Sequence, residues 1–156
     1  MIVGDKILIL VIERITMLEE NLKVKIANEK KEICEFDLVL YEGHPDNNDY
    51  IKLVLQQKEQ AITFSADNYF KALEKLRRYL EDRNQKILCK GSNENVYPSA
   101  MLLDMGAGRN AYSLTLGKQA KLADVVDIFD ESNFDSCVSC DKQKDFFEKW
   151  IESLHK

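Results

Sequence analysis

Residues 67–83 read DNYFKALEKLRRYLEDR and have the clearest helical periodicity in the chain. Apolar side chains recur there at intervals of three and four residues, at Tyr69, Phe70, Leu73, Leu76 and Leu80. This spacing places them on one face of an α-helix, away from most of the charged positions. Ser65 or Asp67 can cap the first turn by accepting hydrogen bonds from free backbone N–H groups. We therefore predict an amphipathic helix over 67–83 that packs on a sheet.

The chain before this helix alternates between apolar and polar residues, as half-buried β-strands do. Leu22, Val24 and Ile26 alternate with lysines, and similar patterns follow over residues 34–40 and 51–55. The polar run between the first two patterns suits a hairpin turn, and a later run rich in turn formers suits a loop. These features predict a meander of antiparallel strands.

A continuous apolar run, ILILVI, occupies residues 7–12. It is shorter than the roughly 7–15 apolar residues of an export signal and the about 20 residues of a membrane helix. We expect a buried strand there. In the absence of an export signal we also expect a cytoplasmic protein with no membrane partner.

Glycines separate two apolar segments in the second half of the chain. Met101–Met105 and Ala111–Leu116 flank Gly106-Ala107-Gly108, and glycine tolerates the backbone angles of tight turns. This arrangement predicts a hairpin or a tight loop. The G-x-G spacing also occurs in phosphate-binding loops, but this segment lacks their third glycine and their Gly-Lys-Ser/Thr ending.

Two further helices are expected nearer the C-terminus. Apolar spacing predicts a short helix over 122–129 and a longer one over 141–155, with Asp141 as its N-cap and the sheet as its packing partner. The chain has 156 residues, of which 45% are hydrophobic and 31% charged, which suits one domain with a substantial core. We therefore predict a single α+β domain over residues 1–156, a mainly antiparallel sheet with two or three packed amphipathic helices.

Few residues suited to catalysis or metal binding stand out. The chain has 2 His and 4 Cys, and neither histidine is an evident general base. Cys137 and Cys140 have the C-x-x-C spacing of redox motifs and of half a zinc site. Cys34 and Cys89 lie far apart in apparent strands and do not form a second pair. We therefore predict no metal, no cofactor and no catalytic residue.

Acidic residues are concentrated in one segment. Residues 122–141 contain six acids and no Lys or Arg, so they carry −6, while the whole chain carries a formal net charge of −5. A field of one sign steers oppositely charged partners. The predicted docking residues for a protein partner are Asp124, Asp127, Asp130, Glu131 and Asp135. The plainer alternative is a solvated loop.

The overall acidity argues against a nucleic-acid partner. A stretch over 71–90 has seven bases against three acids and is the one place where such binding could occur. A salt-dependent affinity for nucleic acid would reveal it.

Three blocks of the C-terminal half resemble a family of small bacterial cytoplasmic proteins. They are NVYPSAM at 95–101, MGAGRNAY at 105–112 and residues 122–130. The layout, a small acidic α+β domain with no catalytic signature, also resembles bacterial toxin-immunity proteins. That resemblance implies a stoichiometric inhibitor that blocks a toxin's active site or substrate surface. An acidic segment that mimics a polyanionic substrate would suit a basic nuclease toxin.

A second hypothesis places a ligand site in the 97–112 segment of a small enzyme or binding domain. Asp104, Arg109 and Tyr112 form the most compact polar group in that segment, and Tyr97 precedes them. A buried pocket that contains these side chains would favour this hypothesis. A loop held by an Asp104–Arg109 contact is the plainer interpretation of the same residues.

Overall fold

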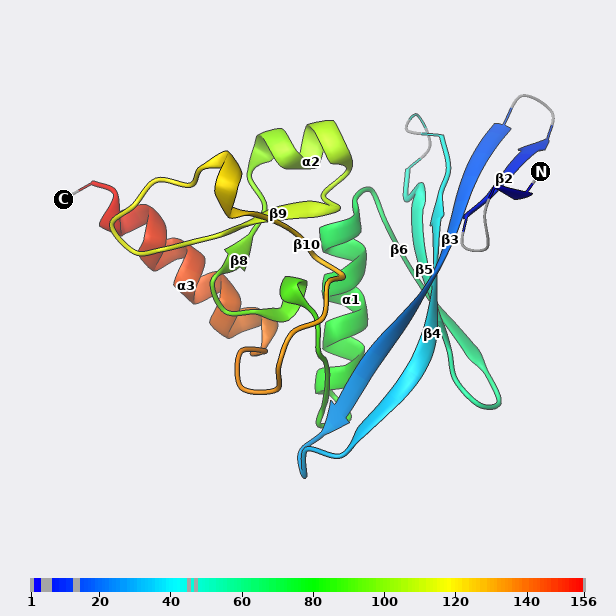
Figure 1. The fold of residues 1–156 in the computed structure, drawn as a ribbon, viewed down its shortest axis with the longest axis horizontal. Helices are drawn as coiled ribbons and strands as arrows, with labels where there is room; N and C mark the ends of the chain where they lie inside the picture. The colour runs from blue at the N-terminus through cyan, green and yellow to red at the C-terminus, as the bar shows by residue number, and fades with distance from the viewer. Residues whose placement is uncertain (1, 4–6, 13–14, 45, 47, 156) are drawn as a thin grey trace.

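A computed structural model of the protein describes residues 2–3, 7–12, 15–44, 46 and 48–155. These residues form two β-sheets and three α-helices (Figure 1). The strands are β1 (Ile2–Val3), β2 (Ile7–Ile12), β3 (Ile15–Asn28), β4 (Ile33–Glu42), β5 (Ile51–Gln56), β6 (Ala61–Ala66), β7 (Gln85–Ile87), β8 (Val96–Tyr97), β9 (Asn110–Ser113) and β10 (Val125–Asp127). The helices are α1 (Tyr69–Glu81), α2 (Ala100–Gly106) and α3 (Cys140–Ser153), with 3₁₀ turns η1 (Lys90–Ser92) and η2 (Leu122–Asp124). The predicted α+β fold is confirmed.

The larger sheet is the predicted antiparallel meander. Its strands follow the order β1-β2-β3-β4-β5-β6, and β7 pairs with the far end of β3. One cross-strand row contains Leu22, Leu38, Leu55 and Ile62, all of which belong to the core or pack against it. The predicted hairpin turn links β3 to β4 after Asn28. The strand predicted at residues 7–12 is present as β2, while the burial of its side chains lies outside the described part of the structure.

Helix α1 lies between the two sheets and buries its apolar face against the larger one (Figure 1). Leu73, Leu76 and Leu80 on this face are fully buried, as the sequence predicted. The N-cap is different from the prediction. Asn68, and neither Ser65 nor Asp67, accepts the hydrogen bond from the Lys71 amide, at 2.8 Å. The reason is that β6 continues through Ala66, so the helix begins slightly later than expected.

The second layer consists of the three-stranded sheet β10-β9-β8 and α3. The prediction that α3 packs on the long sheet is wrong, because α3 contacts α1 and β8 on the other side of α1. Ser139 caps α3 by accepting a hydrogen bond from the Lys142 amide at 3.1 Å, so Asp141 lies inside the helix. None of the described helices combines the length and apolarity that a membrane crossing requires.

The glycine segment ends a helix where a hairpin or loop was predicted. Residues 100–106 form α2, and the Ser99 hydroxyl caps its N-terminus. After α2 the backbone has positive φ angles, 53° at Ala107 and 76° at Gly108, as is common where helices end. A Cβ on Gly108 would lie 3.2 Å from the backbone nitrogen of Phe70, a tight contact, and the positive φ would strain any other residue, so glycine suits this close approach to α1. Phosphate groups bind at helix N-termini, whereas this G-x-G lies at the C-terminus of α2. The segment therefore does not have the geometry of a phosphate-binding loop.

The short helix predicted over 122–129 is also absent. Only the 3₁₀ turn η2 is helical there, and Val125, Val126 and Asp127 form β10, which pairs with β9 through Tyr112 and its neighbours. Adjacent β-branched valines favour a strand when an unpaired strand edge is available. In such a short segment, the spacing of the apolar residues by three and four positions does not distinguish a helix from a strand.

A buried polar network joins α1, η1 and α3. Arg77 is only 3% exposed, and its guanidinium donates to the Gly91 carbonyl, the Val138 carbonyl and the Gln143 side chain at 3.2, 2.8 and 2.6 Å. The side-chain amide nitrogen of Gln143, a residue 2% exposed, lies 2.9 Å from each of the carbonyls of Gly91, Asn93 and Val96, which share its two N–H donors. Buried polar groups are costly without partners, and here the acceptors come from η1 and the residue after it, from β8, from Val138 and from α3.

Replacing Leu76 by Ala tests the packing of α1 on the long sheet. We expect a loss of about 2–5 kcal/mol in unfolding free energy, because Leu76 is fully buried and a cavity remains after truncation. Lys71→Ala, an exposed change on the same helix, is the control and should cost less than about 0.5 kcal/mol. Urea unfolding of both variants provides the measurement. Equal stabilities for the two variants would show that this face of α1 does not pack as described.

Candidate functional site

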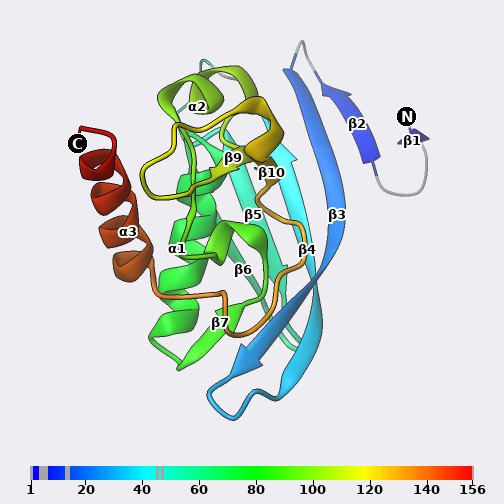
Figure 2. The same ribbon diagram turned by 60° about the vertical axis from the view of Figure 1, so that its left-hand side comes forward.

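The acidic segment leads from β10 to α3 and is tied to the core by its backbone. We call residues 128–138 the strap; Figure 2 shows it in orange, running past β7. Backbone hydrogen bonds join it to residues 88–92 at four points: Gly91 N to Ile128 O (2.8 Å), Lys90 N to Asp130 O (2.7 Å), Ser132 N to Leu88 O (3.1 Å) and Val138 N to Ser92 O (3.0 Å). The strap therefore has a fixed path although it contains neither helix nor long strand.

Three predicted docking residues lie on the strap with their carboxylates at the surface. Glu131 pairs with Lys25 at 3.0 Å and Asp135 with Lys31 at 3.8 Å, yet these two acidic side chains are 68% and 87% exposed. Asp130 is exposed and has no ion pair among the described residues. These three positions therefore carry exposed carboxylates, two of them paired with lysines of β3 and of the turn that follows it, and their role in docking stays a prediction.

Asp124 and Asp127 have local structural roles instead. Asp124 accepts a hydrogen bond from the Lys121 amide at 3.0 Å and so closes η2. Asp127 was expected on the exposed face of a helix, but it lies on β10 with a side chain only 32% exposed. It accepts hydrogen bonds from the Arg109 guanidinium at 3.0 Å and from the Phe129 amide at 2.9 Å.

Arg109 ties the two sheets together. Besides Asp127 on β10, its guanidinium binds Glu20 on β3 through two hydrogen bonds of 2.9 and 3.3 Å. Burial opposes the charged form of Arg109, but the hydrogen bonds to Glu20 and Asp127 outweigh this penalty and raise its pKa. The rings of Tyr69 and Phe129 lie within 6 Å of the guanidinium carbon, at 5.7 and 5.1 Å. Arg109 therefore pairs with Glu20 and Asp127, and not with Asp104 as expected.

Sequence reasoning missed Glu20, although the sequence contained a signal. Glu20 stands between Leu18 and Leu22 in the β3 alternation and lies opposite the buried Leu40 of β4. A charge at an inward position needs a partner, and Arg109 supplies it. The interval of 89 residues between the two could not be inferred from local patterns.

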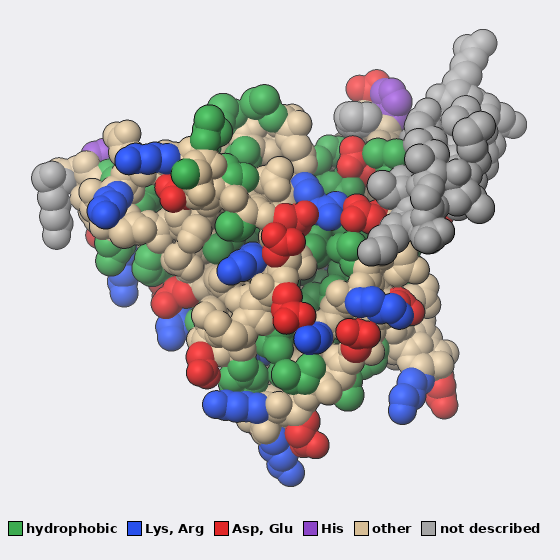
Figure 3. Space-filling model, in the orientation of Figure 1, with side chains coloured by type: hydrophobic (Ala, Val, Ile, Leu, Met, Phe, Trp, Pro, Cys, Tyr) green, Lys and Arg blue, Asp and Glu red, His purple; other side chains and the backbone are tan. Residues whose placement is uncertain are grey.

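The four residues of the second hypothesis do not line one pocket. Arg109 borders a cleft of about 200 Å³, together with Leu18, Glu19, Glu20, Leu40, Glu42, Tyr69 and Gly106. Figure 3 shows acidic and basic side chains at this junction between α2 and the long strands. Asp104 is exposed on α2, Tyr112 is buried in β9, and Tyr97 stacks on Phe147 with ring centroids 4.0 Å apart. The 97–112 segment therefore contributes one polar side chain to the cleft, and Asp127 reaches that side chain from β10.

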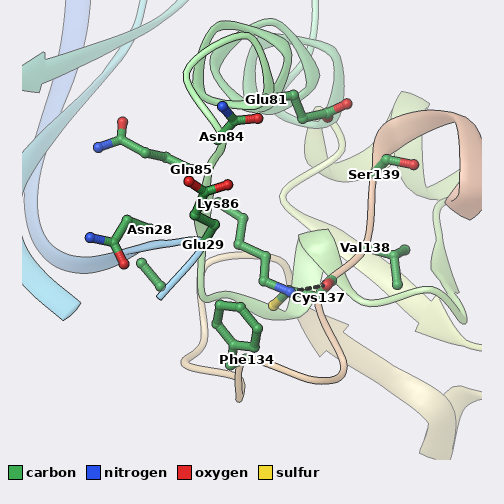
Figure 4. Close-up of a pocket in the computed structure, with 11 residues that line it drawn as sticks. Asn28, Glu29, Glu81, Asn84, Gln85, Lys86, Phe134, Cys137, Val138 and Ser139 are labelled. Atoms are coloured by element: carbon green, nitrogen blue, oxygen red, sulfur yellow. Dashed lines mark hydrogen bonds between the residues drawn. The ribbon is translucent and has the colours of Figure 1, made fainter. Parts of the chain in front are cut away.

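A second, larger cavity of about 320 Å³ lies beneath the strap (Figure 4). Its wall includes Phe134, Cys137 and Val138 from the strap and Lys86 from β7. The Lys86 ammonium donates to the Cys137 carbonyl at 2.8 Å and lies 3.6 Å from the centre of the Phe134 ring. No sequence pattern predicted this cavity, because its walls come from three separate parts of the chain.

The C-x-x-C cysteines point to different partners. The Cys137 thiol lies near the Cys89 carbonyl at 3.7 Å, whereas the Cys140 thiol lies near the Glu74 carbonyl of α1 at 3.9 Å. Burial raises the pKa of Cys137, and it raises the pKa of Cys140 to about 12 and that of Cys89 to about 11. The described residues contain no cluster of three metal-binding side chains. The absence of a metal stays a prediction that elemental analysis can test.

Thiol reactivity distinguishes the four cysteines. Cys34 is exposed and the other three are buried. With 5,5′-dithiobis(2-nitrobenzoate) at pH 8 we expect one fast-reacting thiol per native chain, because the raised pKa values keep the buried thiols protonated. Cys34→Ser should remove the fast phase, and unfolding in denaturant should expose all remaining thiols. Two or more fast thiols in the native protein would contradict the buried positions.

In comparisons with known proteins, no family model and no curated protein matches the chain. Its function is therefore inferred from its own residues and their arrangement.

Proposed function

We propose that this protein binds and neutralises a toxin, as immunity proteins do, and that the strap forms its docking surface. The observation that carries the proposal is that Asp130, Glu131 and Asp135 present exposed carboxylates on a backbone fixed to the core. A surface ordered before binding loses less conformational entropy in the complex, so it favours affinity.

The ion pairs on the strap are compatible with docking. Exposed pairs such as Glu131–Lys25 and Asp135–Lys31 contribute about 0–1 kcal/mol each, so a partner's bases can replace the lysines at small cost. Basic surfaces are typical of proteins that act on nucleic acids. A basic nuclease is therefore the toxin class that an acidic surface suits best, through faster association and charge complementarity.

Asp127 and Arg109 fall outside this docking surface. Their charges are already engaged with each other and with Glu20, in a half-buried position. Changing Asp127 would lower the stability of the fold, so loss of function in such a variant would not report on binding. The docking surface is better tested at the three exposed strap residues.

The triple variant Asp130→Asn, Glu131→Gln, Asp135→Asn tests the proposal. We expect slower association with the toxin encoded by the neighbouring gene, weaker protection on co-expression and an unchanged melting temperature. The matched control is Asp145→Asn, Glu148→Gln, Glu152→Gln, which removes the same charge from exposed positions of α3. It should protect fully.

Two outcomes would overturn the proposal at different levels. Full protection by the strap variant would remove the acidic docking surface while leaving an inhibitor possible. A neighbouring gene without toxic activity, together with no binding to any toxin encoded in the same genome, would reject the immunity function itself.

A further inference from the structure

The cavity beneath the strap has the properties of a small-molecule site. Its volume of about 320 Å³ falls in the range of ligand pockets and has room for on the order of ten non-hydrogen atoms. Ala27, Phe134 and Val138 give it apolar walls. Figure 4 shows Lys86 from β7 beside Phe134 and Val138 from the strap. Ligand pockets combine such walls with a few converging polar groups.

Lys86 is the distinctive polar group in this cavity. Among the described residues it forms no ion pair, in contrast to Lys23, Lys25 and Lys31. One N–H of its ammonium meets the Cys137 carbonyl, which leaves two further donors. A half-buried cation without a carboxylate is unfavourable, and an anion in the cavity would remove that cost.

The charges around Lys86 are consistent with an anionic ligand. Burial lowers the pKa of Lys86, and the nearby Lys31 and Lys142 lower it further, against the opposite influence of Cys137 and Asp135. Two glutamates also line the cavity. The Glu81 carboxylate accepts a hydrogen bond from the Cys140 amide at 3.2 Å. Glu29 is exposed on the turn after β3.

Two amides complete the polar side of the cavity. The side chains of Asn84 and Gln85 line it and form no hydrogen bond with other described residues. Figure 4 shows the Gln85 side chain extending away from the Lys86 ammonium, so the charged group of a ligand would meet Lys86 rather than this amide. The opposite wall, with Phe134 and Val138, suits a hydrocarbon or aromatic body.

We propose that this cavity binds a small organic carboxylate, with the charged group at Lys86 and the apolar body against Phe134 and Val138. This binding activity is independent of the proposed toxin neutralisation. The cavity is lined by Phe134, Cys137 and Val138 of the strap, whereas Asp130, Glu131 and Asp135 are not among its lining residues.

Binding of 3-phenylpropionate, followed by ¹H–¹⁵N NMR of the full chain, tests the proposal. We expect saturable shifts centred on the amides of residues 84–86 and 134–139. The neutral isostere 3-phenylpropan-1-ol should bind at least about tenfold more weakly, because it lacks the charge-assisted hydrogen bond. Lys86→Met should lower the affinity for 3-phenylpropionate by a similar factor. Lys52→Met, an exposed change on β5, should leave this affinity unchanged.

The alcohol comparison uses the unaltered protein, so the test does not depend on the folding of the Lys86 variant. Equal affinity for the carboxylate and the alcohol would overturn the charged role of Lys86. An absence of saturable shifts at about 10 mM carboxylate would overturn the site as a whole, since even millimolar binding would be visible there.

Discussion

The buried contact between Arg77 and Gln143 determines how the second layer is built. Arg77 belongs to α1 and Gln143 to α3, and their side chains meet at 2.6 Å in a region that water does not reach. Together they satisfy carbonyl groups of η1, β8 and the end of the strap. Without these acceptors the buried amide would cost about 1–3 kcal/mol and the buried guanidinium more, because it is charged. The surrounding chain therefore adopts the path that supplies the acceptors.

This constraint explains why an irregular segment can present a defined surface. The strap has little regular secondary structure of its own, but it is hydrogen-bonded along residues 88–92, which the Arg77–Gln143 network holds in place. The exposed carboxylates of the strap and the Lys86 cavity are therefore consequences of the same arrangement. Arg109 adds a second tie, between β3 and β10, at the opposite end of the strap.

Local sequence patterns predicted the long sheet and α1 because both depend on periodic burial of apolar side chains. Leu76 and the row through Leu38 are inward positions of regular elements, and their spacing is visible in the sequence. The second layer is different. Its structure depends on polar contacts between distant residues, such as Glu20 with Arg109 and Arg77 with Gln143, and no local pattern encodes them. The strand β10 was mistaken for a helix for the same reason, since its pairing with β9 decided its conformation.

Native-state hydrogen exchange tests the central claim that the buried network makes the strap rigid. The informative amides are those of Lys90, Gly91 and Ser132, which join the strap to its neighbours, compared with the amide of Leu76 in α1. We expect opening free energies close to that of Leu76, and in Gln143→Leu a selective fall at the amides of Lys90, Gly91 and Ser132 while α1 stays protected. Exchange of these three amides in the unaltered protein as fast as in an exposed turn would contradict the claim.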